Sequence, residues 1–214
     1  MNKSFGDSGK FISFEGGEGT GKSTQAKLLS ENLVHHGIKS LCTREPGGTA
    51  LAEKIRALLV SGSAGKLDGY SEALLHFAAR RSHLVETIWP NLERGTWVIT
   101  DRFSDSSMAY QGTGMEVGKD SIEVLDKLIM GNFCPDLTFI MDMGAEEGLL
   151  RAKKRADGTS KYEKMELEFH KKVREGFLEI ACKNQERCVV IDSSQSIERI
   201  GDNILNVVTS RFKL

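Results

Sequence analysis

A glycine-rich run near the N-terminus carries the clearest chemical signal in the sequence. The segment from Gly16 to Ser23 has the pattern GxxxxGK[ST] and lies between a β-rich run and a helical pattern. The glycines let backbone N–H groups converge on phosphate oxygens, and the start of the following helix adds positive potential. Lys22 is expected to reach the terminal phosphates of ATP, and Ser23 to bind Mg²⁺. The predicted ATP-binding residues are Gly16, Gly17, Glu18, Gly19, Thr20, Gly21, Lys22, Ser23 and Thr24.

A carboxylate at the end of a later strand completes the predicted metal site. Asp101 follows the apolar run from Trp97 to Thr100, as expected of a Walker-B aspartate that meets the metal ion or its waters. The alternative is that Asp101 only caps the next turn. A P-loop is common to kinases, ATPases, GTPases and switch proteins, but the sequence has no NKxD guanine signature, which argues against a GTPase.

Two arginines that follow predicted strands point to a second anion. Arg44 and Arg102 would emerge at the carboxyl edge of an open parallel sheet, beside the P-loop. Each alone could form a surface ion pair, but together they are typical of a phosphate acceptor site. An acceptor monophosphate is mostly dianionic at neutral pH, so its attack needs no general base. Cations that hold two anions in line supply most of what phosphoryl transfer requires, which favours a kinase.

The elements that must position these residues alternate between strand and helix patterns. This alternation predicts an α/β fold of the P-loop NTPase type, with a five-stranded parallel sheet and helices on both faces. A later stripe that begins at Tyr162 and includes Phe169 and Phe177 predicts a helix facing the core. The predicted strands are Phe11 to Glu15, Ile38 to Thr43, Thr96 to Asp101, Leu137 to Asp142 and Cys188 to Asp192.

Length and composition limit the possible classes of protein. The 214 residues suit one domain, predicted over 11–214, with residues 1–10 as an unstructured extension. Lysine and arginine number 29 against 30 acidic residues, so neither nucleic acid nor a membrane is expected as a partner. The four cysteines form no CxxC pair and there is no HExxH motif, which disfavours a zinc site or a disulfide framework. The polar N-terminus and the absence of a long apolar run predict a cytoplasmic protein.

The combined motifs resemble bacterial thymidylate kinases. The resemblance runs from about Phe11 to the C-terminus and is carried by FEGGEGTGKST, TREPGGT, FAARR, DRFSDSSMAYQG and PDLTFIMD. It implies transfer of the ATP γ-phosphate to dTMP to give dTDP, with Mg²⁺, and a homodimer. The alternatives are a kinase for another nucleotide or nucleoside, and an ATPase switch protein.

The resemblance also implies roles at the acceptor site. Arg44 and Arg102 would hold the acceptor phosphate, and Glu18 would approach the sugar 3′-hydroxyl. The tight turn at Glu45 and Pro46 is expected to contain a cis peptide bond.

An aromatic side chain would stack on thymine, with an arginine one turn later at the base edge. Phe77 with Arg80 is the pair predicted here, although His76 with Arg80, or Phe77 with Arg81, also fits helical spacing. A later segment, closing over the nucleotide, would contribute Ser107, Tyr110 and Gln111. In this segment Tyr110 would crowd the sugar 2′ position and favour deoxyribose, unless it only packs in the core.

A basic segment at about 151–164 is expected to form a small helical lid. The P-loop lacks the arginine that some family members place there, so the catalytic cation must come from elsewhere. Arg155 is the predicted source and Arg151 the next, joining Lys22, Arg44 and Arg102 as catalytic residues. The chain has Lys161 where family members often have an arginine, which leaves open which lid residue touches the transferring phosphate.

Overall fold

A central parallel sheet organises the computed structural model, which describes residues 9–61, 67–154 and 161–214. Its strand order is β2-β3-β1-β4-β5, and every neighbouring pair is parallel. The predicted α/β fold is confirmed, and three of the five strands have the predicted bounds. The strands are β1 (Phe11–Glu15), β2 (Ser40–Arg44), β3 (Trp97–Asp101), β4 (Leu137–Asp142) and β5 (Cys188–Asp192).

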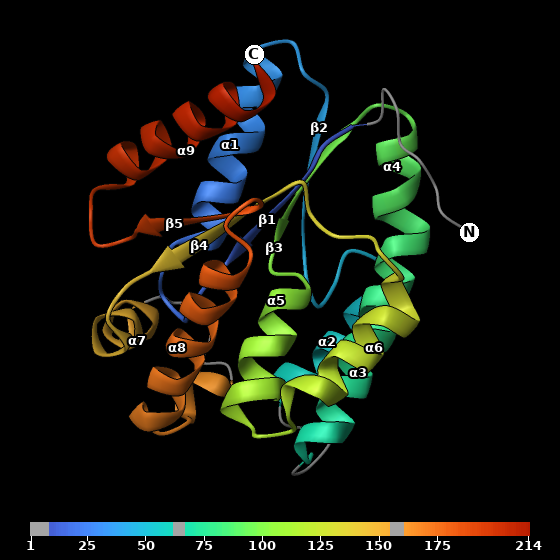
Figure 1. The fold of residues 1–214 in the computed structure, drawn as a ribbon, viewed down its shortest axis with the longest axis vertical. Helices are drawn as coiled ribbons and strands as arrows, with labels where there is room; N and C mark the ends of the chain where they lie inside the picture. The colour runs from blue at the N-terminus through green and yellow to red at the C-terminus, as the bar shows by residue number, and fades with distance from the viewer. Residues whose placement is uncertain (1–8, 62–66, 155–160) are drawn as a thin grey trace.

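Helices cover both faces of the sheet, as Figure 1 shows. On one face α1 (Lys22–His35) and α9 (Ile197–Phe212) pack on alternate strand residues such as Ile12 and Phe14. On the other face Phe11 packs with the helical segments around residues 84–92. Both faces of β1 are therefore buried, which accounts for its continuous apolar run.

The remaining helices form a thick layer on the second face. Two stretches in it are π-helical, η1 and η2, and one short turn is a 3-10 helix, η3. The elements are α2 (Ala50–Ser61), α3 (Gly69–His83), η1 (Leu84–Ile88), α4 (Trp89–Glu93), α5 (Ser104–Ser107), η2 (Met108–Gly114), α6 (Lys119–Met130), α7 (Ala145–Lys153), η3 (Tyr162–Lys164) and α8 (Leu167–Lys183).

The start of the described chain is already part of the fold. The Gly9 N–H donates to the carbonyl of Leu92 at 2.9 Å, and the carbonyl of Lys10 accepts from Val98 at 2.8 Å. The predicted unstructured extension, 1–10, is therefore too long by at least these two residues, and 1–8 lie outside the described residues. Within the described chain, none of the helices combines the length and apolar character that crossing a membrane requires.

The carboxyl edge of the sheet gathers the loops that carry the predicted chemistry. The Glu45 N–H donates to the Asp101 carbonyl and the Arg102 N–H to the Phe14 carbonyl, each at 2.9 Å, so the ends of β1, β2 and β3 are joined. The Glu45–Pro46 peptide bond is cis, as predicted. Arg102 has a φ of 70°, a left-handed conformation that turns the chain sharply after β3.

Candidate active site

The P-loop follows β1 and is closely packed against the end of β4 and against α7. A Cβ atom at Gly16 would lie 2.4 Å from the Met141 carbonyl oxygen, and one at Gly19 would lie 1.9 Å from that of Gly148. Both positions also have positive φ, at 135° and 71°. Only glycine fits at these two positions, so the loop backbone is fixed with its amides at the start of α1.

Lys22 is buried beneath this loop. Its Nζ donates to the Gly17 carbonyl at 2.6 Å and to the Thr20 hydroxyl at 3.3 Å. Burial, and then the charge of Arg102, lower the pKa of Lys22 to about 8. The ammonium group is therefore still mostly charged at neutral pH and lies where terminal phosphates of a nucleotide would meet it.

Ser23 and Asp101, the predicted metal ligands, are in contact. The Ser23 hydroxyl donates to Oδ2 of Asp101. Oδ1 of Asp101 is buried and has no hydrogen-bond partner among the described residues. A hydroxyl, a carboxylate and nucleotide phosphates are the oxygen donors that Mg²⁺ prefers, so these residues fit that ion.

Arg102 joins the P-loop to the helical layer. One guanidinium nitrogen donates to the Gly16 carbonyl and to the Ser106 hydroxyl, each at 3.0 Å. The other donates to Glu18 at 2.9 Å and to the Tyr110 hydroxyl at 3.0 Å. The Tyr110 hydroxyl in turn donates to Glu18 at 2.9 Å, and burial raises its pKa, so it keeps this proton. Glu18, Arg102 and Tyr110 thus form one bonded group.

The second predicted phosphate-binding arginine lies further out. Arg44 is about half exposed, and one of its nitrogens donates to both carboxylate oxygens of Glu53 at 3.0 Å. Arg56, which the sequence analysis missed, donates to the Pro46 carbonyl at 2.9 Å and lines two cavities together with Arg102 and Glu18, whereas Arg44 lines only one of them. The helix that carries Arg56, α2, directly follows the REPGG turn, and this position was the one feature of the sequence that could have indicated a role for Arg56 at the site.

Two cavities open at this edge. The wider one, about 930 Å³, runs along the P-loop and is lined by Lys22, Ser23, Asp101 and Arg151. The narrower one, about 120 Å³, lies between α3, η2 and Tyr162. The two cavities meet, because both are lined by Glu18, Glu45, Arg56, Val60 and Arg102.

Arg80 is the largest fully buried side chain in the described structure and forms one wall of the narrower cavity. Its Nε donates to Glu45 at 2.8 Å, and Nη2 donates to the Phe103 carbonyl and the Ser107 hydroxyl at 3.0 Å. Nη1 is buried without a partner among the described residues. Glu45 also bonds His83 at 3.0 Å, so Arg80 is rigidly held with one donor nitrogen unused.

Phe77 does not face this cavity, contrary to the prediction. It is 1% exposed and packs with Ala73 and Ile122, and its ring supports the Arg80 guanidinium from 4.8 Å. His76 lines the cavity instead, so the structure brings together the His76 and Arg80 pair that the sequence left open. Burial, and then the charge of Arg80, lower the pKa of His76 to about 3, so its ring is neutral.

The predicted residues of α5 and η2, Ser107, Tyr110 and Gln111, are all buried in the wall of the narrower cavity. Ser107 accepts from Arg80, Tyr110 bonds Glu18, and Gln111 approaches the Tyr162 hydroxyl at 3.5 Å. The sequence assigned Tyr162 to a core stripe, and its ring does pack there. The residue also lines the cavity, and its hydroxyl bonds two other residues of the wall, His76 and Gln111.

The predicted lid residues are only partly described. Arg151 donates to the Ser193 carbonyl at 3.0 Å and to Glu147 at 2.7 Å, at the side of the wider cavity. Lys161 is bonded to Glu72 of α3 and is not among the residues that line either cavity. Arg155 lies outside the described residues.

Comparisons with known proteins agree with this geometry. The family model for thymidylate kinase matches residues 14–204. A thymidylate kinase of Magnetococcus marinus is 44% identical over 204 residues, covering 95% of this chain and 97% of the relative. One of Caulobacter vibrioides is 46% identical over 206 residues, covering 96% and 99%.

A solved structure gives the same result. The crystal structure of thymidylate kinase from Ehrlichia chaffeensis superimposes with a TM-score of 0.78 at 38% sequence identity, covering 94% of this chain and 99% of the other. The P-loop, the two joined cavities and these matches together show that the chain belongs to the thymidylate kinase family.

Proposed function

We propose that the chain transfers the γ-phosphoryl group of ATP to dTMP, giving dTDP and ADP. The observation that carries this proposal is the meeting of two cavities at Glu18, Arg56 and Arg102. A donor triphosphate on the P-loop and an acceptor monophosphate in the narrower cavity would bring their reacting phosphates together there. Proximity and charge neutralisation at that junction are the main requirements of phosphoryl transfer.

At the junction, Arg102 and Arg56 would hold the acceptor phosphate, with Arg44 at its outer side. Arg102 presently donates to Glu18, and a phosphate dianion would compete for the same guanidinium. Glu18 would then be available to the sugar 3′-hydroxyl. The acceptor oxygen attacks the γ-phosphorus without a general base, because it is already ionised at neutral pH.

The nucleoside would occupy the narrower cavity. The unused Nη1 donor of Arg80 suits a carbonyl oxygen of thymine, and the neutral ring of His76 offers a face for the base. Ser107 and Gln111 would complete this polar wall. Tyr110, held by Arg102 and Glu18, would crowd the 2′ position and favour deoxyribose.

The triphosphate would lie along the P-loop, with residues 16–24 around its phosphates and Lys22 at the terminal ones. Ser23 and Asp101 would hold Mg²⁺, which neutralises charge on the phosphate oxygens when bound. Support for this role comes from the unpartnered Oδ1 of Asp101.

The segment 151–164 would act as a lid within a single domain, predicted over 11–214 and extended to Gly9 by its bond to Leu92. Arg151 lines the triphosphate cavity, and Arg155, four residues later in the sequence, would supply charge to the transferring group.

A coupled ADP-release assay tests the proposed reaction. ADP should form only when ATP, Mg²⁺ and dTMP are all present, with dTMP preferred over dUMP and strongly over ribonucleotides. ADP release that ignores dTMP would instead favour the ATPase switch, and turnover with a different acceptor would favour another nucleotide kinase.

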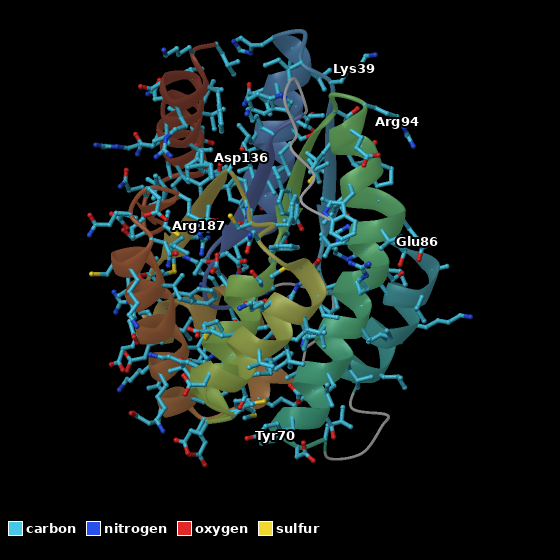
Figure 2. All side chains as sticks on the ribbon, turned by 45° about the vertical axis from the view of Figure 1, so that its right-hand side comes forward. Lys39, Tyr70, Glu86, Arg94, Asp136 and Arg187 are labelled. Atoms are coloured by element: carbon cyan, nitrogen blue, oxygen red, sulfur yellow. The ribbon has the colours of Figure 1, made fainter. Side chains whose placement is uncertain are left out.

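We further propose that the protein is a cytoplasmic homodimer. Support for a dimer comes from large exposed apolar side chains on α3 and on the two helices that it contacts, α2 and α6. They include Leu74, Leu128 and Tyr70, and Tyr70 projects at the lower end of α3 in Figure 2. Sedimentation of the wild type against Leu128→Glu tests the dimer. The four cysteines are free, which suits a reducing compartment.

A further inference from the structure

Glu72 is a buried carboxylate that lies behind the wall of the narrower cavity. It is 1% exposed, belongs to α3, and is not one of the cavity-lining residues. Its Oε1 accepts from the Tyr162 hydroxyl at 2.8 Å and from Nε2 of Gln111 at 3.4 Å, and its Oε2 is bonded to Lys161. The carboxylate therefore joins α3 to η2 and to the segment at residues 161–162.

Two of the partners of Glu72, Tyr162 and Gln111, do line the cavity. The Tyr162 hydroxyl uses its proton on Glu72, so the neutral His76 must donate its Nε2 proton to the same hydroxyl, at 3.1 Å. Burial, followed by the charge of Glu72, raises the pKa of Tyr162, so the hydroxyl stays protonated. Tyr162, Gln111 and the His76 tautomer are thus all set by one carboxylate.

The contact continues to the sugar end of the cavity. The ring of Tyr162 packs edge-on against that of Tyr110, with centroids 5.4 Å apart. Tyr110 is the residue whose hydroxyl bonds Arg102 and Glu18. A shift of Tyr162 would therefore displace the ring of Tyr110, which is proposed to exclude a 2′-hydroxyl.

We propose that Glu72 is a positioning residue for the acceptor nucleotide, and that deoxyribose selectivity depends on its hold on Tyr162. This inference rests on the proposed function. A buried charge is costly unless it is paired, and here a lysine and two neutral donors from two other elements pair it. Removing the charge leaves Lys161 without its anionic partner and weakens the hydrogen bond that holds the Tyr162 hydroxyl, while Tyr110 keeps its own bonds.

The test measures the ratio of kcat/KM for dTMP to kcat/KM for 5-methyl-UMP, which differs from dTMP by one 2′-hydroxyl. Glu72→Gln, Lys161→Met and Tyr162→Phe should each lower this ratio, the first by about tenfold, as expected when a hydrogen bond to a charged acceptor becomes one to a neutral acceptor. The double variant Glu72→Gln/Tyr162→Phe should lose no more than the larger single effect, because the two residues act through one contact. Thermal unfolding of each variant is measured alongside.

Asp105→Asn is the matched control. Asp105 is also buried and ion-paired, to Arg187 at 2.7 Å, but it does not line the narrower cavity (Arg187 is labelled in Figure 2). It should lower the melting temperature without changing the ratio. The inference is overturned if the ratio is unchanged in Tyr162→Phe and is also unchanged in either of the other two variants, Glu72→Gln or Lys161→Met, provided that this variant is folded. A wild type that turns over no dTMP contradicts the proposed function instead.

Discussion

Replacing Arg102 is the sharpest test of the site, because this side chain joins both cavities. Its two terminal nitrogens make four hydrogen bonds, of which one is to the Glu18 carboxylate, and its side chain is 17% exposed. When dTMP binds, Arg102 would pair with the acceptor phosphate, and truncating one partner of a largely buried charge pair typically costs about 2 to 5 kcal/mol. In Arg102→Met, dTMP should therefore bind at least about thirtyfold more weakly, since about 1.4 kcal/mol is tenfold in Kd.

The measurement is calorimetric titration of dTMP without ATP, together with the coupled ADP-release assay. Arg102→Lys should be intermediate, because it keeps a charge but cannot bond the P-loop and Tyr110 at once. Arg94→Met is the control, because it removes the same charge. Arg94, labelled in Figure 2, is exposed after α4 and precedes the start of β3, whereas Arg102 follows the end of that strand. A Kd for dTMP within threefold of wild type in Arg102→Met would refute the role given to this residue.

Three further predictions concern the triphosphate side. Asp101→Asn should lower kcat at 1 mM Mg²⁺ (about physiological), with part of the loss recovered as Mg²⁺ is raised; a loss that is independent of Mg²⁺ would contradict the metal role. Because the pKa of Lys22 is about 8 before ATP binds, ATP affinity should fall as pH rises from 8 to 10 and this group loses its charge, whereas Lys22→Arg should be less sensitive in binding titrations over the same range. Arg155→Ala should lower kcat steeply while both dissociation constants stay within a few fold, with Arg151→Ala and Lys161→Ala as comparisons; three variants with near wild-type kcat would place the catalytic cation elsewhere.

The parts of the site that could be predicted are those that depend on local sequence. The P-loop and the strand ends carrying Asp101 and Arg102 follow from glycine spacing and short apolar runs, and the structure brings them together as expected. A strand end in a parallel sheet leaves its next residues only one edge at which to emerge. This is why Arg102 could be placed without tertiary information.

The helical wall could not be placed in the same way. Neighbouring residues on a helix differ by about 100°, so His76 and Phe77 face different surroundings, and both suit an aromatic position by type. Tyr162 presented a different difficulty, because its ring lies in an apolar cluster while the residue also lines the cavity and its hydroxyl bonds polar side chains of the wall. Apolar periodicity reports only where the ring lies. Arg56 belongs to no motif of its own, and its place beside Arg102 and Glu18 depends on how α2 packs in the folded chain.

The close approach of Gly19 and Gly148 has a consequence for how such an enzyme can be altered. A Cβ at Gly148 would lie 2.4 Å from the Glu18 carbonyl, so the main chains of the P-loop and α7 touch with no side chain between them. A larger residue at one of these positions cannot be accommodated by a smaller residue at the other, because both are already glycine and have no side chain to remove. An engineer who wished to graft a cationic side chain onto the loop at position 19 would first have to displace α7, and with it Arg151. A cationic side chain at position 19 and Arg151 in its present place therefore exclude one another on this backbone.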